Sequence, residues 1–423
     1  MTMEFHLRPP VVDTRSWPDV ASVPAGVRAR VAAPITLSLL RRAADRAGIC
    51  VEIASGTPSH IDAPTMMIAD PDAFARRVGT NGLIGLGESY MAGEWDSPDL
   101  VDVLTRLAGI IATSVPRWLQ RLRALHLTSP PASDDPAKTN SRNNIARHYD
   151  LSNEFFAGFL DETMTYSAAL FHDPDAARWD SLAQAQRQKI DRLLDQAGVT
   201  RGTRLLEIGT GWGELAVRAA ARGARVHSVT LSSEQLEAAR AKVNAAGLAD
   251  RVDITLTDYR DLTGKYDAVV SVEMIEAVGY AYWPTYFATL RSLVTPGGRI
   301  ALQAITMPHD RMLASRNTHT WIQKYIFPGG LLPSTQAVVD NAAAVGLRVT
   351  DRLSMAPHYA QTLKLWRHRF DTVGVASLPP GGDDVFVRMW HFYLTYSEAG
   401  FRSNYLDVEQ FTFSVDDGEG HHV

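Results

Sequence analysis

The residues with the clearest chemical potential lie in the stretch LLEIGTGWGE, residues 205–214. Glu207 belongs to an apolar run, and Gly209, Gly211 and Gly213 follow it. Glycine adopts positive φ angles and lets a ligand lie against bare backbone at the start of a helix. The spacing is GxGxG, not the GxGxxG of a dinucleotide-binding loop, and no GK[ST] of a P-loop follows. The stretch predicts a ligand-binding turn between a strand and a helix, and a turn without a ligand is the alternative.

The segment after this turn alternates between apolar strands and amphipathic helices. Such alternation is typical of a parallel sheet with helices on both faces, in which ligands bind beyond the carboxyl ends of the strands. Strands are expected at 204–208, 225–232, 252–258, 266–274 and 299–306, and helices at 216–224, 232–247 and 283–294. Polar residues stand at the strand ends: Glu207 and Gly209, Thr230 and Ser232, Asp258 and Tyr259, Glu273 and Glu276. The fold class is therefore α/β, with the site at this edge of the sheet.

Composition narrows the class of protein. The 423 residues, 45% apolar and 21% charged, are typical of a soluble globular protein with roughly two or three domains. A net charge of −5 argues against a general nucleic-acid binder. The single cysteine, Cys50, excludes intramolecular disulfides and a cysteine-based zinc site, and it fits a reducing compartment. No signal peptide and no membrane-spanning helix are expected, because the sequence has neither an apolar h-region near its start nor a long apolar run.

Four segments are expected along the chain. Residues 1–30 are polar and contain prolines, which predicts an arm, and residues 31–126 predict a smaller α+β domain. Its elements are expected as helix 35–48, strands 49–54 and 65–69, and helices 70–78 and 97–112. The stretch LTSPPASDDPAKTNSR (127–142) reads as a linker, and 143–423 as the catalytic domain with helical inserts at 308–334 and 367–406.

Residues 110–126 form a basic amphipathic pattern. Ile, Val, Trp and Leu alternate there with Arg117, Arg121 and Arg123. Such a helix can lie on an anionic bilayer, or it can pack between domains with a solvated basic edge. The sequence leaves both open.

Longer motifs resemble the cyclopropane-fatty-acid synthase and mycolic-acid methyltransferase family. They are RHYDLSNEFFAGFLDETMTYSAALF (147–171), VTLSSEQ (229–235), EMIEAVG (273–279), KYIFPGGLLPS (324–334), HYAQTLKLW (358–366) and GFRSNYLDVEQFTF (400–413). The likeness covers 140–415, and GLIGLGESYMAGEWDSPDLVDVL (82–104) is similar to the accessory domain of phospholipid-acting members. The resemblance implies a class I S-adenosylmethionine-dependent methyltransferase with a Rossmann-like sheet. The nearest subgroup is the actinobacterial fatty-acyl methyltransferases that lead to 10-methylstearate, or tuberculostearic acid.

The resemblance assigns residues to S-adenosylmethionine. Glu207 would take its ammonium group, or else be a strand-end carboxylate bonded to loop amides. Gly209 and Gly211 would let the backbone approach the cofactor. Thr230 and Gln235 would hold the ribose diol in place of the usual acid.

The remaining cofactor positions flank the adenine and the methionine carboxylate. Tyr259 and Arg260 match the adenine-flanking positions, although an acidic or polar residue is expected where Arg260 stands. Tyr166 and Ser167 match residues that hold the carboxylate. No metal site is expected.

On the acceptor side, the resemblance implies bound bicarbonate as the base. Glu276, Tyr359 and the backbone amide of Ile305 match positions that hold it. Gln303 stands where many members have histidine, and it can still donate a hydrogen bond. Ala168 stands where cysteine is expected, which removes a side-chain contact and leaves the backbone amide.

Aromatic residues gather late in the chain. They suit the wall of an acyl tunnel, where each ring offers a cation roughly 0.5–2 kcal/mol of stabilisation. Ordinary core packing is the alternative. The residues are Trp321, Tyr325, Phe327, Trp366, Trp390, Phe392, Tyr393 and Tyr396.

The resemblance implies methylation of the double bond of an unsaturated fatty-acyl chain, oleoyl in phospholipid. Loss of a proton after a hydride shift gives a 10-methylene chain, which a partner reductase saturates to the 10-methyl product. Direct proton loss gives a cyclopropane, which is the alternative; the likeness to the tuberculostearic acid subgroup favours the methylene, and the residues themselves do not separate the two. A small-molecule methyltransferase and a lipid-binding pseudoenzyme are the rival interpretations. The expected place is the cytoplasm, peripheral at the inner face of the cell membrane, with transient membrane contact and a homo-oligomer left open.

Overall fold

The computed structural model describes residues 10–53, 63–114, 131 and 152–415. The chain forms two compact units. Unit 1 comprises the described residues of 1–129 with 318–326 and 363–405, and unit 2 those of 130–317, 327–362 and 406–423. Two segments that the sequence analysis placed in the catalytic domain therefore belong to unit 1. The expected boundaries of the four segments stay a prediction.

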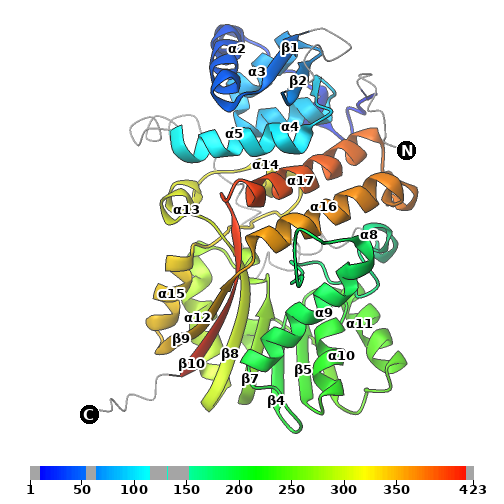
Figure 1. The fold of residues 1–423 in the computed structure, drawn as a ribbon, viewed down its shortest axis with the longest axis vertical. Coiled ribbons are helices and arrows are strands. Elements are labelled where there is room, and N and C mark those ends of the chain that lie inside the picture. Colours follow the sequence, from blue (N-terminus) through cyan, green and yellow to red (C-terminus); the bar gives the residue numbers. More distant parts are fainter. Residues whose placement is uncertain (1–9, 54–62, 115–130, 132–151, 416–423) are drawn as a thin grey trace. The chain divides into compact units, whose positions relative to one another are not determined.

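Unit 1 is mainly helical with a small sheet of order β1-β2-β3 (Figure 1). Its elements are α1 (Pro18–Ala21), α2 (Val27–Ala47), β1 (Cys50–Ile53), β2 (Thr65–Ile68), α3 (Pro71–Asn81), α4 (Leu83–Met91), β3 (Trp95–Asp96), α5 (Leu100–Ser114), α14 (Trp321–Tyr325), η5 (Gly374–Ser377) and α17 (Asp384–Arg402). It also takes α16 (Ala356–Thr372) from residue 363 onward. Part of the expected arm is helical, because α1 and the start of α2 fall within it.

Helix α4 was not expected from the sequence. Glycine lowers helix propensity, and the segment contains Gly85 and Gly87. A Cβ at Gly85 would lie 2.1 Å from the carbonyl oxygen of Arg77, and one at Gly87 2.3 Å from Cδ1 of Trp321. Close packing within unit 1 therefore requires these glycines and overrides their poor propensity.

Buried arginines tie distant segments of unit 1 together. Arg388 of α17 donates to the Asp96 carboxylate at 3.0 Å and to the Tyr90 carbonyl at 2.7 Å. Its guanidinium carbon lies 4.2 Å from the centre of the Tyr90 ring. Arg77 pairs with Glu94 at 2.7 Å. Since each buried charge has a hydrogen-bonded partner, removing either member of a pair would leave an uncompensated charge.

Unit 2 contains a seven-stranded sheet of order β6-β5-β4-β7-β8-β10-β9. Its strands are β4 (Arg204–Ile208), β5 (Arg225–Thr230), β6 (Val252–Leu256), β7 (Tyr266–Val272), β8 (Val294–Thr306), β9 (Leu347–Ser354) and β10 (Asp407–Val415). The helices are α8 (Asn153–Phe159), α9 (Trp179–Gln196), α10 (Glu214–Ala221), α11 (Ser233–Ala245), α12 (Trp283–Leu293), α13 (His309–Ser315) and α15 (Thr335–Ala343), with short η2 (Tyr259–Asp261), η3 (Ile275–Ala277) and η4 (Tyr280–Tyr282).

The expectation of a parallel sheet needs one correction. Strands β4 to β8 pair in parallel, as the alternation of strands and helices predicted. Strand β10, however, runs antiparallel to both β8 and β9. The sheet is mixed because the chain returns from the helical segment before 406 and inserts its last strand between two earlier ones. Neither β9 nor β10 was expected.

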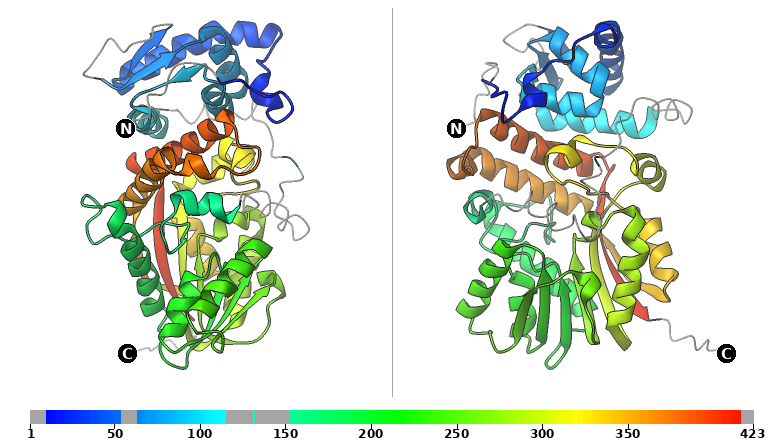
Figure 2. Two further views of the ribbon diagram at one scale, coloured as in Figure 1. Left: turned by 90° about the vertical axis from the view of Figure 1, so that its right-hand side faces the viewer. Right: turned by 180° about the vertical axis from the view of Figure 1, so that it is seen from behind.

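Helices cover both faces of the sheet, as predicted (Figure 2). On β7, Ala268 and Val270 pack with residues of α9 and α10, whereas Val269 packs with residues of α12 and α15. Successive side chains of a strand point to opposite faces, so an unbroken apolar strand requires a helical layer on each side. The carboxyl ends of the strands are thereby left for binding.

Some expectations fall outside the described residues. The linker at 127–142 lies almost wholly outside them, and of the basic amphipathic segment 110–126 only the beginning, in α5, is described. Within the described part of the chain, no helix combines the length and the apolar character needed to cross a membrane.

Candidate active site

The glycine turn follows β4 and opens α10. Gly209, Gly211 and Gly213 have φ angles of 97°, 53° and 88°, which disfavour other residues. The amides of Gly209 and Thr210 donate to the carbonyl of Val229 at 3.0 and 3.2 Å, which fixes the turn against β5. A Cβ placed on Gly211 meets no atom within 4 Å. The turn thus leaves open space beside bare backbone, as a cradle for a ligand requires.

Glu207 points its carboxylate into a buried polar cluster below this turn. Its side chain accepts a hydrogen bond from the Ser228 hydroxyl at 2.6 Å, and Ser228 also contacts the Thr210 hydroxyl at 2.7 Å. Burial raises the pKa of Glu207 to about 8. A cation bound nearby would favour the charged carboxylate. The carboxylate thus contacts a serine hydroxyl of β5, where the alternative expected bonds to loop amides.

Thr230 and Gln235 are brought together at the end of β5. The Thr230 hydroxyl donates to the side-chain carbonyl of Gln235 at 3.0 Å, and both residues are buried. Ser232 caps α11 by accepting from the Gln235 amide at 3.1 Å. The cap sets the position of Gln235 relative to the strand end.

Beyond the end of β6, Tyr259 and Arg260 make different kinds of contact. Tyr259 packs edge-on against Tyr286, with ring centres 5.4 Å apart. Arg260 makes an ion pair with Asp258 at 2.6 Å and lies over the Tyr259 ring at 5.5 Å. The arginine therefore holds this strand end together, whereas its expected adenine contact stays a prediction.

The loop that carries Tyr166 and Ser167 is attached to the glycine turn through α8. Tyr166 packs against Phe156 with ring centres 5.3 Å apart, and Phe156 packs against Trp212 at 5.1 Å. The Trp212 indole nitrogen donates to the Asn153 side chain at 2.8 Å. Residues far apart in sequence thus meet on one side of the turn.

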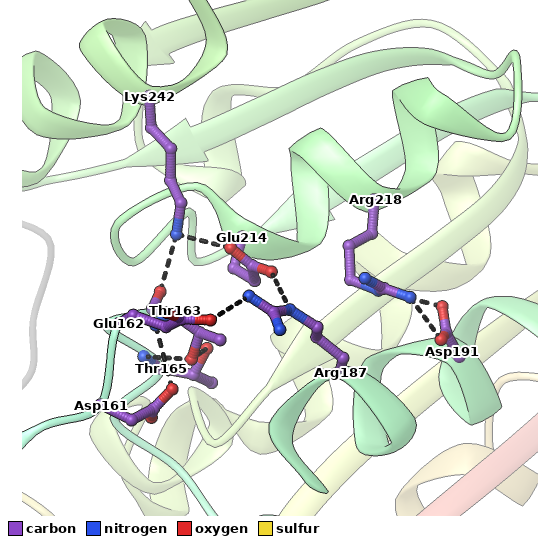
Figure 3. Close-up of polar contacts among 9 residues, drawn as sticks. All are labelled: Asp161, Glu162, Thr163, Thr165, Arg187, Asp191, Glu214, Arg218 and Lys242. Carbon is purple, nitrogen blue, oxygen red and sulfur yellow. Dashed lines mark hydrogen bonds and ion pairs between the residues drawn. The ribbon is translucent and has the colours of Figure 1, made fainter. Parts of the chain in front are cut away.

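Ion pairs and a hydrogen bond hold the segment just before this loop (Figure 3). The Lys242 ammonium group pairs with Glu214, the first residue of α10, and donates to the Thr163 carbonyl at 2.8 Å. Arg187 bridges Glu214 at 3.5 Å and Glu162 at 2.6 Å. Residues of α9, α10 and α11 therefore hold the loop before Tyr166. These contacts centre on Glu214, which directly follows the glycine turn.

Lys189 is a fully buried cation next to this loop, and sequence reasoning assigned it no role. Its ammonium group donates to the Ser167 hydroxyl, and Gln186 donates to the Ser167 carbonyl at 2.8 Å. Burial lowers the pKa of Lys189 to about 8, although the negative charges of Glu273 and Asp161 oppose that shift. Lys189 thus links the two sides of the site electrostatically.

Glu273 is the centre of the acceptor side. Its carboxylate accepts from the Ala168 amide at 2.9 Å, from the Gln303 side-chain amide at 2.8 Å and from the Tyr359 hydroxyl at 3.0 Å. Its backbone has φ 49°, a strained value for a residue other than glycine. Burial raises its pKa, and the Lys189 charge lowers it. Three donors expected to hold bicarbonate therefore converge on a carboxylate of the chain itself.

Glu276 lies beside this group but has other contacts. Its Oε1 accepts from the Ile305 amide at 2.6 Å, whereas its Oε2 is buried with no hydrogen-bond partner. Burial, and next the charge of Glu273, raise the pKa of Glu276 to about 8. Glu276 and Ile305 meet as expected, while Tyr359 contacts Glu273.

Strand β10 fixes the amide that reaches Glu273. Gln410 stands opposite Gln303 in the antiparallel pair and donates to its side-chain carbonyl at 3.0 Å. With its oxygen occupied in this way, the amide nitrogen of Gln303 must point toward Glu273. The sequence analysis marked Glu273 only as a polar residue at the end of a strand. The signal available in the sequence was an acidic residue directly after an apolar strand.

The late aromatic residues lie mostly in unit 1. All except Phe327 belong to it, and Trp321 packs against Phe392 with ring centres 4.8 Å apart. Trp366, Trp390 and Phe392 are buried there. Core packing accounts for these contacts, and an acyl tunnel stays a prediction.

Comparisons with known proteins identify the family of the chain. Residues 136–411 match the family described as mycolic acid cyclopropane synthetase. The chain is 58% identical to the tuberculostearic acid methyltransferase UfaA1 of Mycobacterium tuberculosis, over 97% of the chain and 98% of that protein. It is 32% identical to the cyclopropane-fatty-acyl-phospholipid synthase of Escherichia coli K12, over 87% and 91% of the two chains.

Solved structures give the same relationship. The cyclopropane synthase MmaA2 of Mycobacterium tuberculosis is 31% identical and has a TM-score of 0.59, covering 64% of this chain and 97% of its own. The mycolic acid cyclopropane synthase CmaA1, solved with SAH and CTAB, is 32% identical and has a TM-score of 0.58 with the same coverage. Both are matched over nearly their whole length.

Proposed function

The chain belongs to the mycolic acid cyclopropane synthetase family, and on that premise we propose that it methylates the double bond of an unsaturated fatty-acyl chain. It is an S-adenosylmethionine-dependent methyltransferase of the class I fold. The observation that carries the proposal is the Glu273 carboxylate, which three hydrogen-bond donors hold at the sheet edge that also bears the glycine turn.

The glycine turn fits the cofactor. When bound, S-adenosylmethionine supplies an electrophilic methyl group on its sulfonium. The open space at Gly211 would admit its methionine half, and the buried Glu207 would take the ammonium group. Ser167 with Tyr166 would hold the carboxylate. Thr230 and Gln235 would hold the ribose diol, and Tyr259 would pack on the adenine.

The acceptor side fits removal of a proton. As an alkene carbon bonds to the methyl group, its neighbour becomes cationic, and a nearby carboxylate stabilises that charge. The reaction ends when the base removes a proton from the cation, which gives a neutral product. Because Ala168, Gln303 and Tyr359 already donate to Glu273, we assign the base to the Glu273 carboxylate in place of bound bicarbonate. Glu276, with its raised pKa, would be the neutral neighbour that keeps this pair to one negative charge.

Two products are compatible with these residues. Proton loss directly from the transferred methyl group closes a cyclopropane, whereas proton loss after a hydride shift gives an exocyclic methylene. We favour the methylene, because a relative named tuberculostearic acid methyltransferase is 58% identical over nearly the whole length. A separate reductase would then give the methyl branch.

The substrate class follows from the names of the relatives. The Escherichia coli relative is named for acyl chains in phospholipid, and we propose oleoyl phospholipid here as well. The enzyme would then work in the cytoplasm at the inner face of the cell membrane, in transient contact with it.

The test is the fatty-acid profile of a host that is fed oleate and expresses the protein. The proposal expects membrane lipids that gain one CH₂ per oleoyl chain, and ozone cleavage of the product to a ketone, since a methylene is cleaved and a cyclopropane is not. Glu273→Gln should abolish the gain, and Glu237→Gln, at an exposed position of α11, should not. Unmodified oleate with stable, cofactor-binding protein would contradict the proposal.

A further inference from the structure

Helix α2 carries large apolar residues on its outward face. Val27, Val31, Ile35 and Leu39 are 71%, 59%, 57% and 58% exposed. Residues four apart lie on one side of a helix, and at 1.5 Å per residue this row is roughly 18 Å long. Contiguous exposed apolar surface of this kind marks an interaction site more often than chance.

The inward face of α2 combines buried alanines with the half-buried Leu37 and Leu40. Ala29, Ala33 and Ala44 are buried, and α2 packs against α3, α5 and β1. Its approach to α3 is close: a Cβ on Gly79 would lie 2.6 Å from the Thr36 hydroxyl and 2.9 Å from the Ala32 Cβ. An ordinary surface helix turns its large apolar residues inward. On α2, Val27, Val31, Ile35 and Leu39 face outward in addition to the leucines that face inward.

Arginines share the outward face. Arg28, Arg42 and Arg46 are exposed, and at about 100° per residue they fall within the arc from Val27 to Leu39. Arg30 and Arg41 are exposed at the margin of that arc, and the one acid of the helix, Asp45, is exposed at its Val27 edge. The face is therefore apolar and carries a net positive charge.

We propose that this face of α2 docks on an anionic lipid bilayer. Aliphatic side chains would enter the boundary between headgroups and acyl chains, while the arginine stems lie along it and their guanidinium groups reach lipid phosphates. A second copy of the chain fits less well, because a two-fold contact of α2 with itself would oppose arginine to arginine. The inference deepens the proposed function, since it rests on a bilayer being the source of the acyl chain.

The experiment measures binding of the full-length protein to vesicles. Flotation with phosphatidylglycerol–phosphatidylcholine vesicles is compared with pure phosphatidylcholine. Val31→Gln with Ile35→Gln should lower the partition coefficient at least about tenfold, and both changes favour the helix since Gln has the higher propensity. Arg28→Gln, Arg42→Gln and Arg46→Gln together should lower it about 100-fold at low salt and remove most of its salt dependence.

Matched controls come from exposed positions of unit 2. Leu256→Gln with Leu313→Gln removes apolar residues that are both 39% exposed, and Arg201→Gln with Arg225→Gln removes exposed charge. These variants should bind vesicles like the parent. Light scattering reports the mass of each protein, and transfer to detergent-dispersed oleoyl phospholipid reports catalysis without a bilayer.

The outcomes separate the two proposals. Loss of vesicle binding and of activity on vesicles, with activity in detergent retained, supports docking through α2. Equal vesicle binding by the α2 variants and the parent overturns it, as does a fall in oligomer mass with vesicle binding unchanged. A parent that binds vesicles but transfers no methyl group in detergent contradicts the proposed function and leaves docking supported.

Discussion

The two halves of the active-site edge are built in different ways. Beside the glycine turn, the strand-end contacts join residues near in sequence: Thr230 to Gln235, 5 apart, and Glu207 to Ser228, 21 apart. On the acceptor half, Glu273 meets Tyr359 and Ala168 across 86 and 105 residues. A local motif therefore specifies the strand ends of the first half, whereas the complete fold assembles the second half and adds the loop of Tyr166 and Ser167 to the first.

The halves also differ in what they leave for a ligand. Gly211 faces open space on the cofactor half, which leaves room for a ligand. The donors on the acceptor half are engaged by Glu273. The proposed function has one half recognise a diffusible group and the other supply its own reactive group, and four predictions test this contrast.

The largest effect is expected for Glu273→Gln. The amide cannot take up a proton, and its NH₂ group would face donors that now point at a carboxylate. Turnover should fall about 1000-fold, within the range for a positioned proton-transfer group. Cofactor affinity, measured by calorimetry, should stay unchanged, because that half of the site is untouched.

Turnover without bicarbonate distinguishes a base that belongs to the protein from bicarbonate taken up from solution. Turnover of the parent should not change when bicarbonate is purged from the buffer. A strong dependence on bicarbonate in the parent, or near-parental turnover in Glu273→Gln, would return the base to a bound anion beside Glu276.

Gly211→Ala should weaken the cofactor half alone. The added methyl group meets no protein atom, but it enters the space a ligand would occupy, so the cofactor dissociation constant should rise about 30-fold, ~2 kcal/mol. Gly202→Ala is the matched control, because Gly202 also has a positive φ of 86° and open surroundings and precedes β4 at the other end of the strand. If both substitutions change affinity equally, backbone strain explains the effect and the cradle is refuted.

Lys189→Met should shift the pH profile of turnover. The Lys189 charge lowers the pKa of Glu273, so its loss raises that pKa further and the carboxylate form appears only at higher pH. The rise of kcat/KM with pH should therefore move up by about one pH unit, on the scale expected for a lost neighbouring charge. Lys189→Arg should restore most of the parental profile. An unmoved profile in a folded Lys189→Met protein would separate Lys189 from the base.

The smallest effect concerns the stability of the cofactor-free protein. The pKa of Glu207 is about 8 when folded, against an ordinary value of 4.5, so the folded state holds a proton that the unfolded state has released between these values. Stability from this group is present below pH 4.5 and is lost as pH rises toward 8. Glu207→Gln removes the dependence, and its melting temperature should gain about 2–4 °C on the parent between pH 5 and 8. Parallel curves would show that Glu207 does not titrate with folding.

Much of unit 2 could be read from the sequence, because strands β4 to β8 and their helices each show a local period. Strand β10 could not be predicted in this way, because it pairs Asp407 with Thr306 and no local pattern near either residue indicates its partner. Helix α4 was missed because tight packing, not propensity, selects Gly85 and Gly87.

The site divides in the same way. Glu207, Gly209 and Gly211 are visible in one short motif, and family resemblance pointed to Glu276 and Tyr359. The hydrogen-bonded cluster around Glu273 was not predicted, because its three donors come from Ala168, Gln303 and Tyr359 on separate elements. Resemblance also directed attention to Glu276 and away from Glu273, although both lie in the motif EMIEAVG (273–279).

Unit 1 combines an N-terminal segment with segments near the end of the chain, and this has a consequence for biosynthesis. Asp96 meets its buried partner Arg388 across 292 residues. At ribosomal speeds of about 5–20 residues per second, this partner follows on the order of tens of seconds later. During that interval Trp95 and Tyr90 lack the helix that buries them, so the nascent chain presents apolar surface that chaperones recognise. We therefore expect a fragment ending at residue 114 to aggregate when it is made alone, and the full chain to gain solubility from slower, cooler synthesis.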